Sequence, residues 1–162
     1  AAVAAPATLT FTPANYATQQ AVTVAGVNAA DGTSEAVTIT VSSAGLPAQA
    51  VAVTVTDDDV QALQTTVAEL SVLEGTSVQL GIRLAIQPAA PVSVNVVSSD
   101  LGAAGVAPAF LTFTPANYAT VQLVTVTAVN DPDFADELVT LTVTSPGLAP
   151  RTVAVDVVDN DL

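Results

Sequence analysis

Hydrophobic and polar residues alternate along much of the chain with a period of two. Valine, leucine and isoleucine occupy every second position in residues 37–41, 51–55, 78–84 and 92–96, and mostly small or polar residues lie between them. Such alternation is typical of β-strands that bury one face and expose the other, and β-branched residues favour this conformation. The pattern therefore predicts an all-β protein.

Turn-forming residues separate the alternating segments. Proline, glycine and asparagine are found at 87–88, 114–117 and 145–147, where a β protein needs its chain reversals. In the second part of the chain we predict seven strands, near residues 66–73, 77–86, 91–98, 110–113, 121–129, 138–144 and 152–158. Seven short strands in about 100 residues are typical of an immunoglobulin-like antiparallel β-sandwich.

An internal repeat indicates the domain organisation. The segment LTFTPANYAT occurs at residues 9–18 and again at 111–120, an offset of 102, and 31 of the 51 positions from 9 to 59 are identical to their partners. Chance matches within a biased composition do not explain this, so we predict tandem immunoglobulin-like sandwiches. Residues 61–162 form a complete repeat, and residues 1–60 hold only the last four strands of an incomplete one.

The incomplete repeat would leave both of its sheets with open edges, which invite pairing with further strands. Two sources could supply the missing strands. Sequence preceding residue 1 is the first, and a neighbouring subunit is the second, in which case strand complementation would also build a fibre. The expected partners are therefore neighbouring repeats of the same protein or identical subunits.

Acidic residues are concentrated in loops that a sandwich with alternating strand directions places at one pole. These are the loops after the first, third and fifth strands, and the end of the seventh. In the complete repeat the acids are Glu74, Asp100, Asp131, Asp133, Asp136, Glu137, Asp159 and Asp161; in the first repeat they are Asp31, Glu35, Asp57, Asp58 and Asp59. The opposite pole is neutral apart from Arg151.

Clustered carboxylates without softer ligands are the donors that Ca²⁺ prefers, because this ion takes six to eight oxygen ligands from flexible loops. The alternative is an acidic pole without an ion, since charged residues belong in solvated loops and exposed carboxylates repel each other weakly in water. The convergence of four chain segments favours Ca²⁺, which we expect to bind at the domain junction and to stiffen it. The fifth loop of the first repeat, residues 28–32, has fewer acids and predicts a weaker site.

The segments that carry these acids also resemble a known family. VLEGTS, LTFTPANY, VNDPDFADE and DVVDND are together similar to the Calx-β and Calx-β-like repeats of bacterial surface proteins and adhesins. The resemblance implies an immunoglobulin-like sandwich that binds Ca²⁺ through Glu74, the stretch 131–137 and the triplets 57–59 and 159–161. It also implies an extracellular, cell-surface protein that acts as an extender or fibre. Asn160 departs from the family pattern, which has an acid there.

The composition argues against most other functions. The chain has no His, no Cys and 2 Lys and Arg residues against 15 Asp and Glu residues, for a net charge of −13. Without imidazole or thiol groups, most common catalytic and zinc sites cannot be built, so we do not expect an enzyme. The negative charge argues against binding to nucleic acid or to anionic membranes, and no apolar run is long enough to cross a bilayer.

An adhesin that binds a surface ligand directly is the alternative function. Such a domain calls for an exposed aromatic or polar patch, whereas the chain has only 4 Phe and 2 Tyr residues and its strand faces are mainly Thr and Ala. We expect Tyr16 and Tyr118, at matching positions of the repeat, to fill the neutral pole. A glycosidase site built from paired carboxylates would lack an aromatic platform for sugars.

Overall fold

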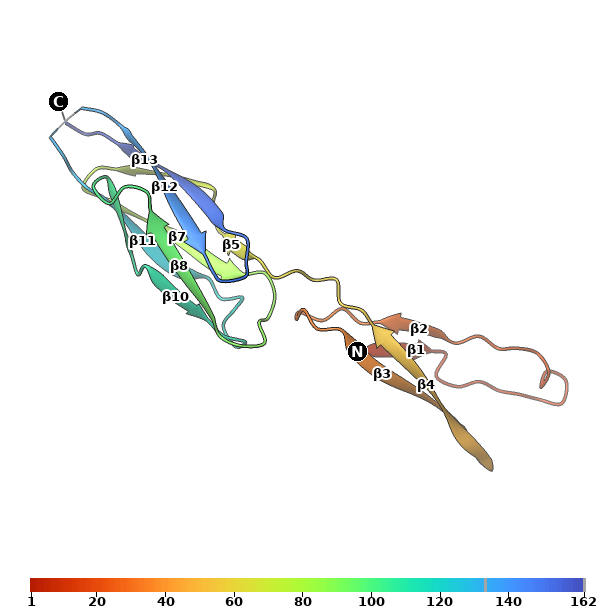
Figure 1. The fold of residues 1–162 in the computed structure, drawn as a ribbon. Helices are drawn as coiled ribbons and strands as arrows, with labels where there is room; N and C mark the ends of the chain where they lie inside the picture. Colours follow the sequence, from red (N-terminus) through yellow and green to blue (C-terminus); the bar gives the residue numbers. More distant parts are fainter. Residues whose placement is uncertain (133, 162) are drawn as a thin grey trace. The chain divides into compact units, whose positions relative to one another are not determined.

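The chain consists of two compact units, residues 1–59 and 60–162. The computed structural model describes residues 1–132 and 134–161, and all of its regular secondary structure is β-strand (Figure 1). Within these described residues no helix is long and apolar enough to cross a membrane.

The second unit is a two-layered β-sandwich. Its strands are β5 (Leu63–Thr65), β6 (Glu69–Leu73), β7 (Ser77–Leu84), β8 (Val92–Ser98), β9 (Ala104–Ala107), β10 (Phe110–Phe113), β11 (Gln122–Ala128), β12 (Glu137–Thr144) and β13 (Arg151–Val158). One sheet has the order β10-β8-β12-β13-β6 and the other the order β5-β7-β11-β9. The predicted all-β sandwich is therefore confirmed. All seven predicted strands are present, and the short strands β5 and β9 are additional.

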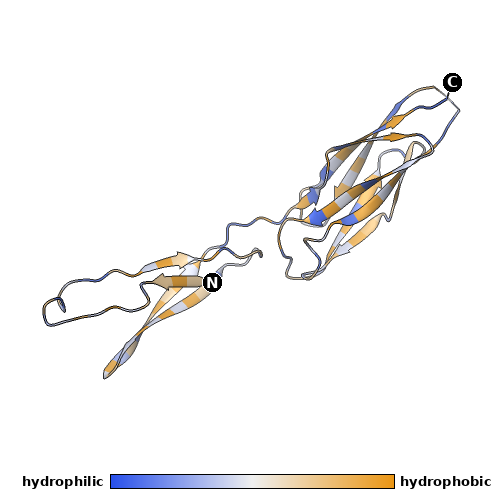
Figure 2. Cartoon of the chain, turned by 180° about the vertical axis from the view of Figure 1, so that it is seen from behind, coloured by the Kyte–Doolittle hydropathy of each residue, from blue (hydrophilic) through white to orange (hydrophobic). Residues whose placement is uncertain are grey.

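The core of this unit comes from the alternating hydrophobic positions. Val153, Val155 and Val157 of β13 are fully buried, while Asp156 between them is exposed. Leu80 and Ile82 of β7, in the other sheet, belong to the same buried cluster. Figure 2 shows this alternation of hydrophobic and polar positions along the strands. Each such side chain contributes about 1.5–3 kcal/mol when fully buried, so the alternation supplies the main stabilising term.

One strand pairing positions the acidic loops. All pairs in the second unit are antiparallel except that of β6 with β13, which is parallel from Ala154↔Glu69 to Val158↔Leu73. Because both strands run in the same direction, they end side by side. Glu74 therefore follows β6 at the point where β13 ends.

The first unit contains two small antiparallel sheets. Strands β1 (Ala2–Ala5) and β2 (Thr23–Gly26) form one, and β3 (Glu35–Ser43) and β4 (Leu46–Val55) form the other. With the offset of 102 residues, β1 corresponds to β9, β2 to the second half of β11, and β3 and β4 to β12 and β13. The register is also the same, since Glu35 faces Val55 as Glu137 faces Val157.

Strands in the first unit exist only where a partner strand is present. Residues 8–11, the counterpart of β10, form no strand, because β10 pairs with β8 and the first unit has no counterpart of β8. Residues 20–22 likewise form no strand, whereas their counterparts 122–124 in β11 pair with β7. The four strands are thus not the four that the repeat predicted: β1 is present and the counterpart of β10 is not.

Candidate metal centre

The turn after β6 places Glu74 against the end of β13. Gly75 has a φ of 70°, in the left-handed region that glycine adopts without a steric penalty. The backbone N–H and the hydroxyl of Thr76 both donate to the carbonyl oxygen of Leu73, at 3.1 and 2.6 Å. The N–H of Glu74 donates to the carbonyl oxygen of Val158 at 3.0 Å, so the turn is held from both sides.

The side chain of Glu74 is buried without a counter-charge. It is 2% exposed, and among the described residues neither carboxylate oxygen has a hydrogen-bond partner of good geometry. Burial raises the pKa of Glu74, the nearby carboxylates of Asp131, Asp159 and Asp161 raise it further, and the backbone of Asp131 lowers it only in part. A buried carboxylate in this setting is stable only if it takes up a proton or a cation compensates its charge.

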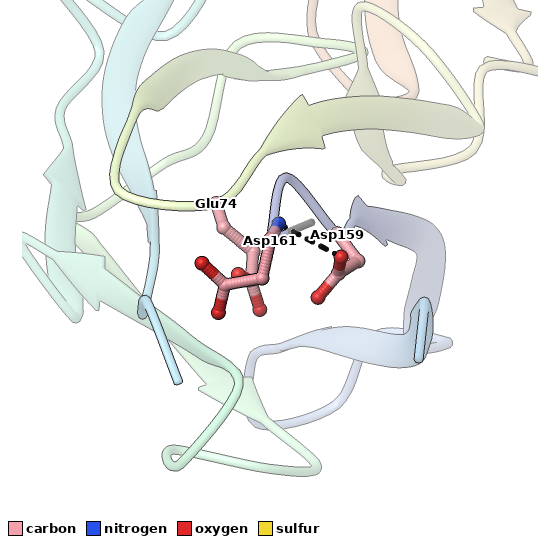
Figure 3. A group of neighbouring side chains, drawn as sticks. All are labelled: Glu74, Asp159 and Asp161. Carbon is pink, nitrogen blue, oxygen red and sulfur yellow. Dashed lines mark hydrogen bonds between the residues drawn. The ribbon is translucent and has the colours of Figure 1, made fainter. Parts of the chain in front are cut away.

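Two groups of carboxylates share Glu74. One consists of Glu74, Asp159 and Asp161, and the other of Glu74, Asp131 and Glu137. In each group, one oxygen from every residue lies within 4.8 Å of the others. Figure 3 shows the first group, in which the acids at the end of β13 lie beside Glu74. Three chain segments therefore bring five carboxylates to one small region.

Hydrogen bonds hold the end of the chain in this arrangement. The N–H of Asp161 donates to Oδ1 of Asp159 at 2.9 Å, and the N–H of Asp159 donates to Oδ1 of Asp136 at 2.8 Å. The side-chain amide of Asn160 donates to the carbonyl oxygen of Glu74 at 2.9 Å. Asp136 and Asn160 thus support the site from outside the two groups. The sequence offered no signal for the role of Asn160, because its partner is a backbone atom 86 residues away.

Two further predicted ligands of the second unit remain, Asp100 and Asp133. Asp100 is exposed, accepts a hydrogen bond from the N–H of Gly102 at 2.7 Å, and belongs to neither group. Asp133 lies outside the described residues. Among the described residues, the structure therefore brings together fewer acids than the predicted acidic pole holds.

The first unit gathers its acids less tightly. None of Asp31, Glu35, Asp57, Asp58 and Asp59 belongs to a described group of three carboxylates with ligand spacing. Oδ1 of Asp31 accepts from the N–H of Thr33 at 3.0 Å, and Glu35 forms an ion pair with the amino group of Ala1. The physical reason is that the first unit has no counterpart of Glu74, the residue that both groups of the second unit share.

The donor set fits Ca²⁺. The five carboxylates offer only hard oxygen atoms, which suit a Ca²⁺ coordination shell of six to eight oxygens. The unpartnered oxygens of Glu74 are a second and independent observation in favour of a bound cation, because buried polar atoms normally have partners. No nitrogen or sulfur ligand that would favour a transition metal is near, since the chain lacks His and Cys.

Comparison with known proteins gives a structural match but no family. No family model and no curated protein matches the chain. Domains 4–9 of the surface layer protein SbsC match with 24% identity and a TM-score of 0.52, over 72% of this chain and 17% of that one. A structure of SbsC domains 4 and 5 matches with 24% identity and a TM-score of 0.48, over 68% of this chain and 59% of that one.

A third structure in the comparison is an enzyme. The Bacteroides ovatus GH5 xyloglucanase matches with 13% identity and a TM-score of 0.46, over 62% of this chain and 19% of that one. This chain thus spans less than two thirds of each of these three proteins. The match to SbsC domains 4–9 establishes a shared β fold.

Proposed function

We propose that the chain is a non-enzymatic structural repeat of a secreted or cell-surface bacterial protein, an extender or fibre element whose sandwich is stiffened by Ca²⁺. The observation that carries this proposal is the buried, unpartnered carboxylate of Glu74 among four further acids. The resemblance to Calx-β repeats and the shared fold with a surface layer protein support it.

The proposed Ca²⁺ ion would connect three segments of the second unit. Without a cation, the carboxylates of Glu74, Asp159 and Asp161 repel one another, and this repulsion destabilises the contact between the turn after β6 and the end of β13. A Ca²⁺ ion would be held by Glu74, Asp131, Glu137, Asp159 and Asp161 and would link these segments to the loop after β11. Binding to the folded state alone stabilises that state by mass action.

Stiffening of the junction follows from sequence position. Asp57, Asp58 and Asp59 directly precede Val60, the first residue of the second unit. A cation bound by this triplet would restrict the backbone where one unit passes into the next. We propose that the cation changes the range of angles between the units while each unit keeps its own fold.

The test is thermal unfolding of the full chain in Ca²⁺, in Mg²⁺ and in EDTA. We expect Ca²⁺ to raise the melting temperature of the second unit and Glu74→Gln to abolish that rise. Asp100→Asn is the matched control, because Asp100 lies at a loop of the same unit outside both groups, and its Ca²⁺ response should equal that of the wild type. A melting temperature that chelation leaves unchanged would refute the calcium site.

Small-angle scattering tests the stiffening. We expect the full chain to sample a narrower distribution of maximum dimensions in Ca²⁺ than in EDTA. Replacement of Asp57, Asp58 and Asp59 by asparagine should make the two conditions alike. Identical scattering of the wild type with and without Ca²⁺ would count against a stiffening role.

A further inference from the structure

Both basic side chains of the protein line one cavity of the second unit. The cavity has a volume of about 590 Å³, and its lining includes Arg83 and Arg151, which are the only Lys or Arg residues of the chain. It lies where the chain crosses from one sheet to the other between β5 and β6, beside the end of β7 and the start of β13. We call this space the arginine cavity. Its other described lining residues are neutral.

Neither arginine has a counter-charge. Among the described residues, no carboxylate forms an ion pair with Arg83 or Arg151. Glu69 follows the lining residue Ala68 in the chain, yet it is not part of the lining. A guanidinium group stays charged at physiological pH and forms its strongest hydrogen bonds with anionic oxygens. The described part of the chain thus supplies the cations of this cavity but no anion for them.

The negative net charge of the protein does not cancel this local positive charge. Arg151 is the first residue of β13, and Asp159 directly follows Val158, the last. A strand rises about 3.3 Å per residue, so the two charged residues are roughly 26 Å apart. Exposed charges are screened beyond about 8 Å at physiological ionic strength. The arginine cavity is therefore locally positive.

The guanidinium group of Arg151 is held in place. Its Nε donates to the carbonyl oxygen of Leu63 at 3.0 Å, a bond that joins the start of β13 to β5. Its two terminal amino groups make no hydrogen bond to a described residue. A guanidinium group that is fixed in advance loses less conformational freedom when it binds a ligand.

Gly81 allows two lining side chains to pack closely against β7. A Cβ at this position would lie 2.6 Å from Cγ2 of Thr66 and 2.6 Å from Cγ1 of Val121. The N–H of Gly81 donates to Oγ1 of Thr66 at 3.1 Å, and the N–H of Thr66 donates to the carbonyl oxygen of Gly81 at 2.9 Å. The hydroxyl of Thr66 therefore accepts from the backbone and keeps its own proton for donation.

Neutral polar residues account for much of the remaining lining. They include Gln64, Thr65 and Thr152, whose side chains form no hydrogen bond to a described residue. The volume lies within the range of small-molecule sites, about 300–1,000 Å³, and is much larger than a single carboxylate needs. Side-chain amides and hydroxyls are suitable partners for the hydroxyl groups of a sugar ring.

We propose that the arginine cavity binds an acidic saccharide, with a uronic acid carboxylate at the two arginines and ring hydroxyls at the neutral polar residues. Recognition depends on charge and hydrogen bonds and not on stacking, because no described aromatic residue lines the cavity. The inference is independent of the proposed calcium site, since Arg83 and Glu74 lie at opposite ends of β7.

The internal repeat supplies a conservative variant for the test. Gln49 corresponds to Arg151 with the offset of 102, and it also lies in a strand, β4. We therefore expect Arg151→Gln to fold. Arg83→Gln is a second variant that removes no hydrogen bond to a described residue. Circular dichroism confirms that both variants are folded.

The experiment is a calorimetric titration of the full chain with a tetramer of galacturonic acid in EDTA at low ionic strength. We expect the wild type to bind, and each of the two variants to bind at least about tenfold more weakly, because each loses a charge-assisted contact. The methyl-esterified tetramer keeps the rings and the hydroxyls but not the charge, and it should also bind at least about tenfold more weakly. Absence of binding to the wild type would overturn the proposal.

Further comparisons distinguish a saccharide site from general attraction between charges. Arg151→Lys keeps the charge but not the planar group, so it should bind the tetramer more weakly than the wild type does. Glu69→Gln is the matched control and should bind at least as tightly as the wild type. A tetraglutamate peptide that binds as tightly as the saccharide would overturn the saccharide assignment. Unchanged binding in a variant without both arginines would overturn the site itself.

The outcomes also separate this inference from the proposed function. Glu74→Gln removes the shared residue of the proposed calcium site and should bind the tetramer as the wild type does. A chain that responds to Ca²⁺ but does not bind the tetramer refutes the saccharide site and leaves the proposed function intact. A chain that binds the tetramer but does not respond to Ca²⁺ refutes the calcium site and supports this inference.

Discussion

Phe11 and Phe113 occupy the same position of the 102-residue repeat, yet Phe113 is fully buried and Phe11 is 54% exposed. Both follow the same Leu-Thr pair, and in both units an asparagine four residues later accepts hydrogen bonds from the threonine after the phenylalanine. The local sequence is therefore the same, and only the surrounding strands differ.

This pair yields a direct comparison of two identical substitutions. We expect Phe113→Ala to destabilise the second unit by about 3–5 kcal/mol, because it removes a fully buried ring and leaves a cavity. Phe11→Ala should change stability by less than about 0.5 kcal/mol, as surface substitutions do. Urea unfolding followed by circular dichroism measures both. Equal losses would show that the first unit buries Phe11 in solution.

Glu74→Gln should have opposite effects with and without calcium. In EDTA the substitution removes a buried negative charge among other acids, so we expect a higher melting temperature than that of the wild type. In Ca²⁺ at about 100 times its Kd, the wild type should gain about 2.7 kcal/mol, or roughly 10–20 °C, and the variant should gain nothing. Differential scanning calorimetry measures both effects. A variant that loses stability in EDTA would contradict the repulsion argument.

The stability of the calcium-free second unit should rise as the pH falls. Burial raises the pKa of Glu74 above its ordinary value of 4.5. The folded unit therefore binds this proton more tightly than the unfolded chain, and the resulting stability is complete below pH 4.5 and is lost as the pH rises through the folded-state pKa. Melting in EDTA from pH 7 down to pH 4.5 should show this rise, and Glu74→Gln should reduce it. If the melting temperature of the variant depended on pH as that of the wild type does, groups other than Glu74 would be responsible.

Gly75→Ala should weaken the turn that carries Glu74. The φ of 70° costs an alanine about 1 kcal/mol, although its methyl group would have ordinary contact distances, the nearest being 3.7 Å from Oδ1 of Asn130. The measurement is again urea unfolding, together with a Ca²⁺ titration. Gly105→Ala is the control, since a Cβ there meets nothing within 4 Å and its φ is not positive. A loss of stability at Gly105 equal to that at Gly75 would argue against a conformational cause.

The sequence alone was sufficient for the repeat and for seven of the nine strands of the second unit. Alternating valines mark β12 and β13 and their counterparts β3 and β4, because burial on one face requires a period of two. The offset of 102 located the matching loops, which hold Asp131, Glu137, Asp159 and Asp161, and the strand pattern of the complete repeat placed Glu74 in a loop of its own. The strands and the repeat can be read from one sequence because both depend only on the spacing of residues along the chain.

Only the tertiary structure decided which of these residues act together. The alternation of hydrophobic and polar residues does not reveal that β6 pairs in parallel with β13. This pairing nevertheless brings Glu74 next to Asp159 and Asp161 and buries the side chain of Glu74. Strand formation at residues 8–11 and 20–22 likewise depends on partners far away in the chain, so closely similar sequence folds differently in the two units. The local pattern determines which segments are able to form strands. Pairing with distant strands and burial determine which of those segments do form them.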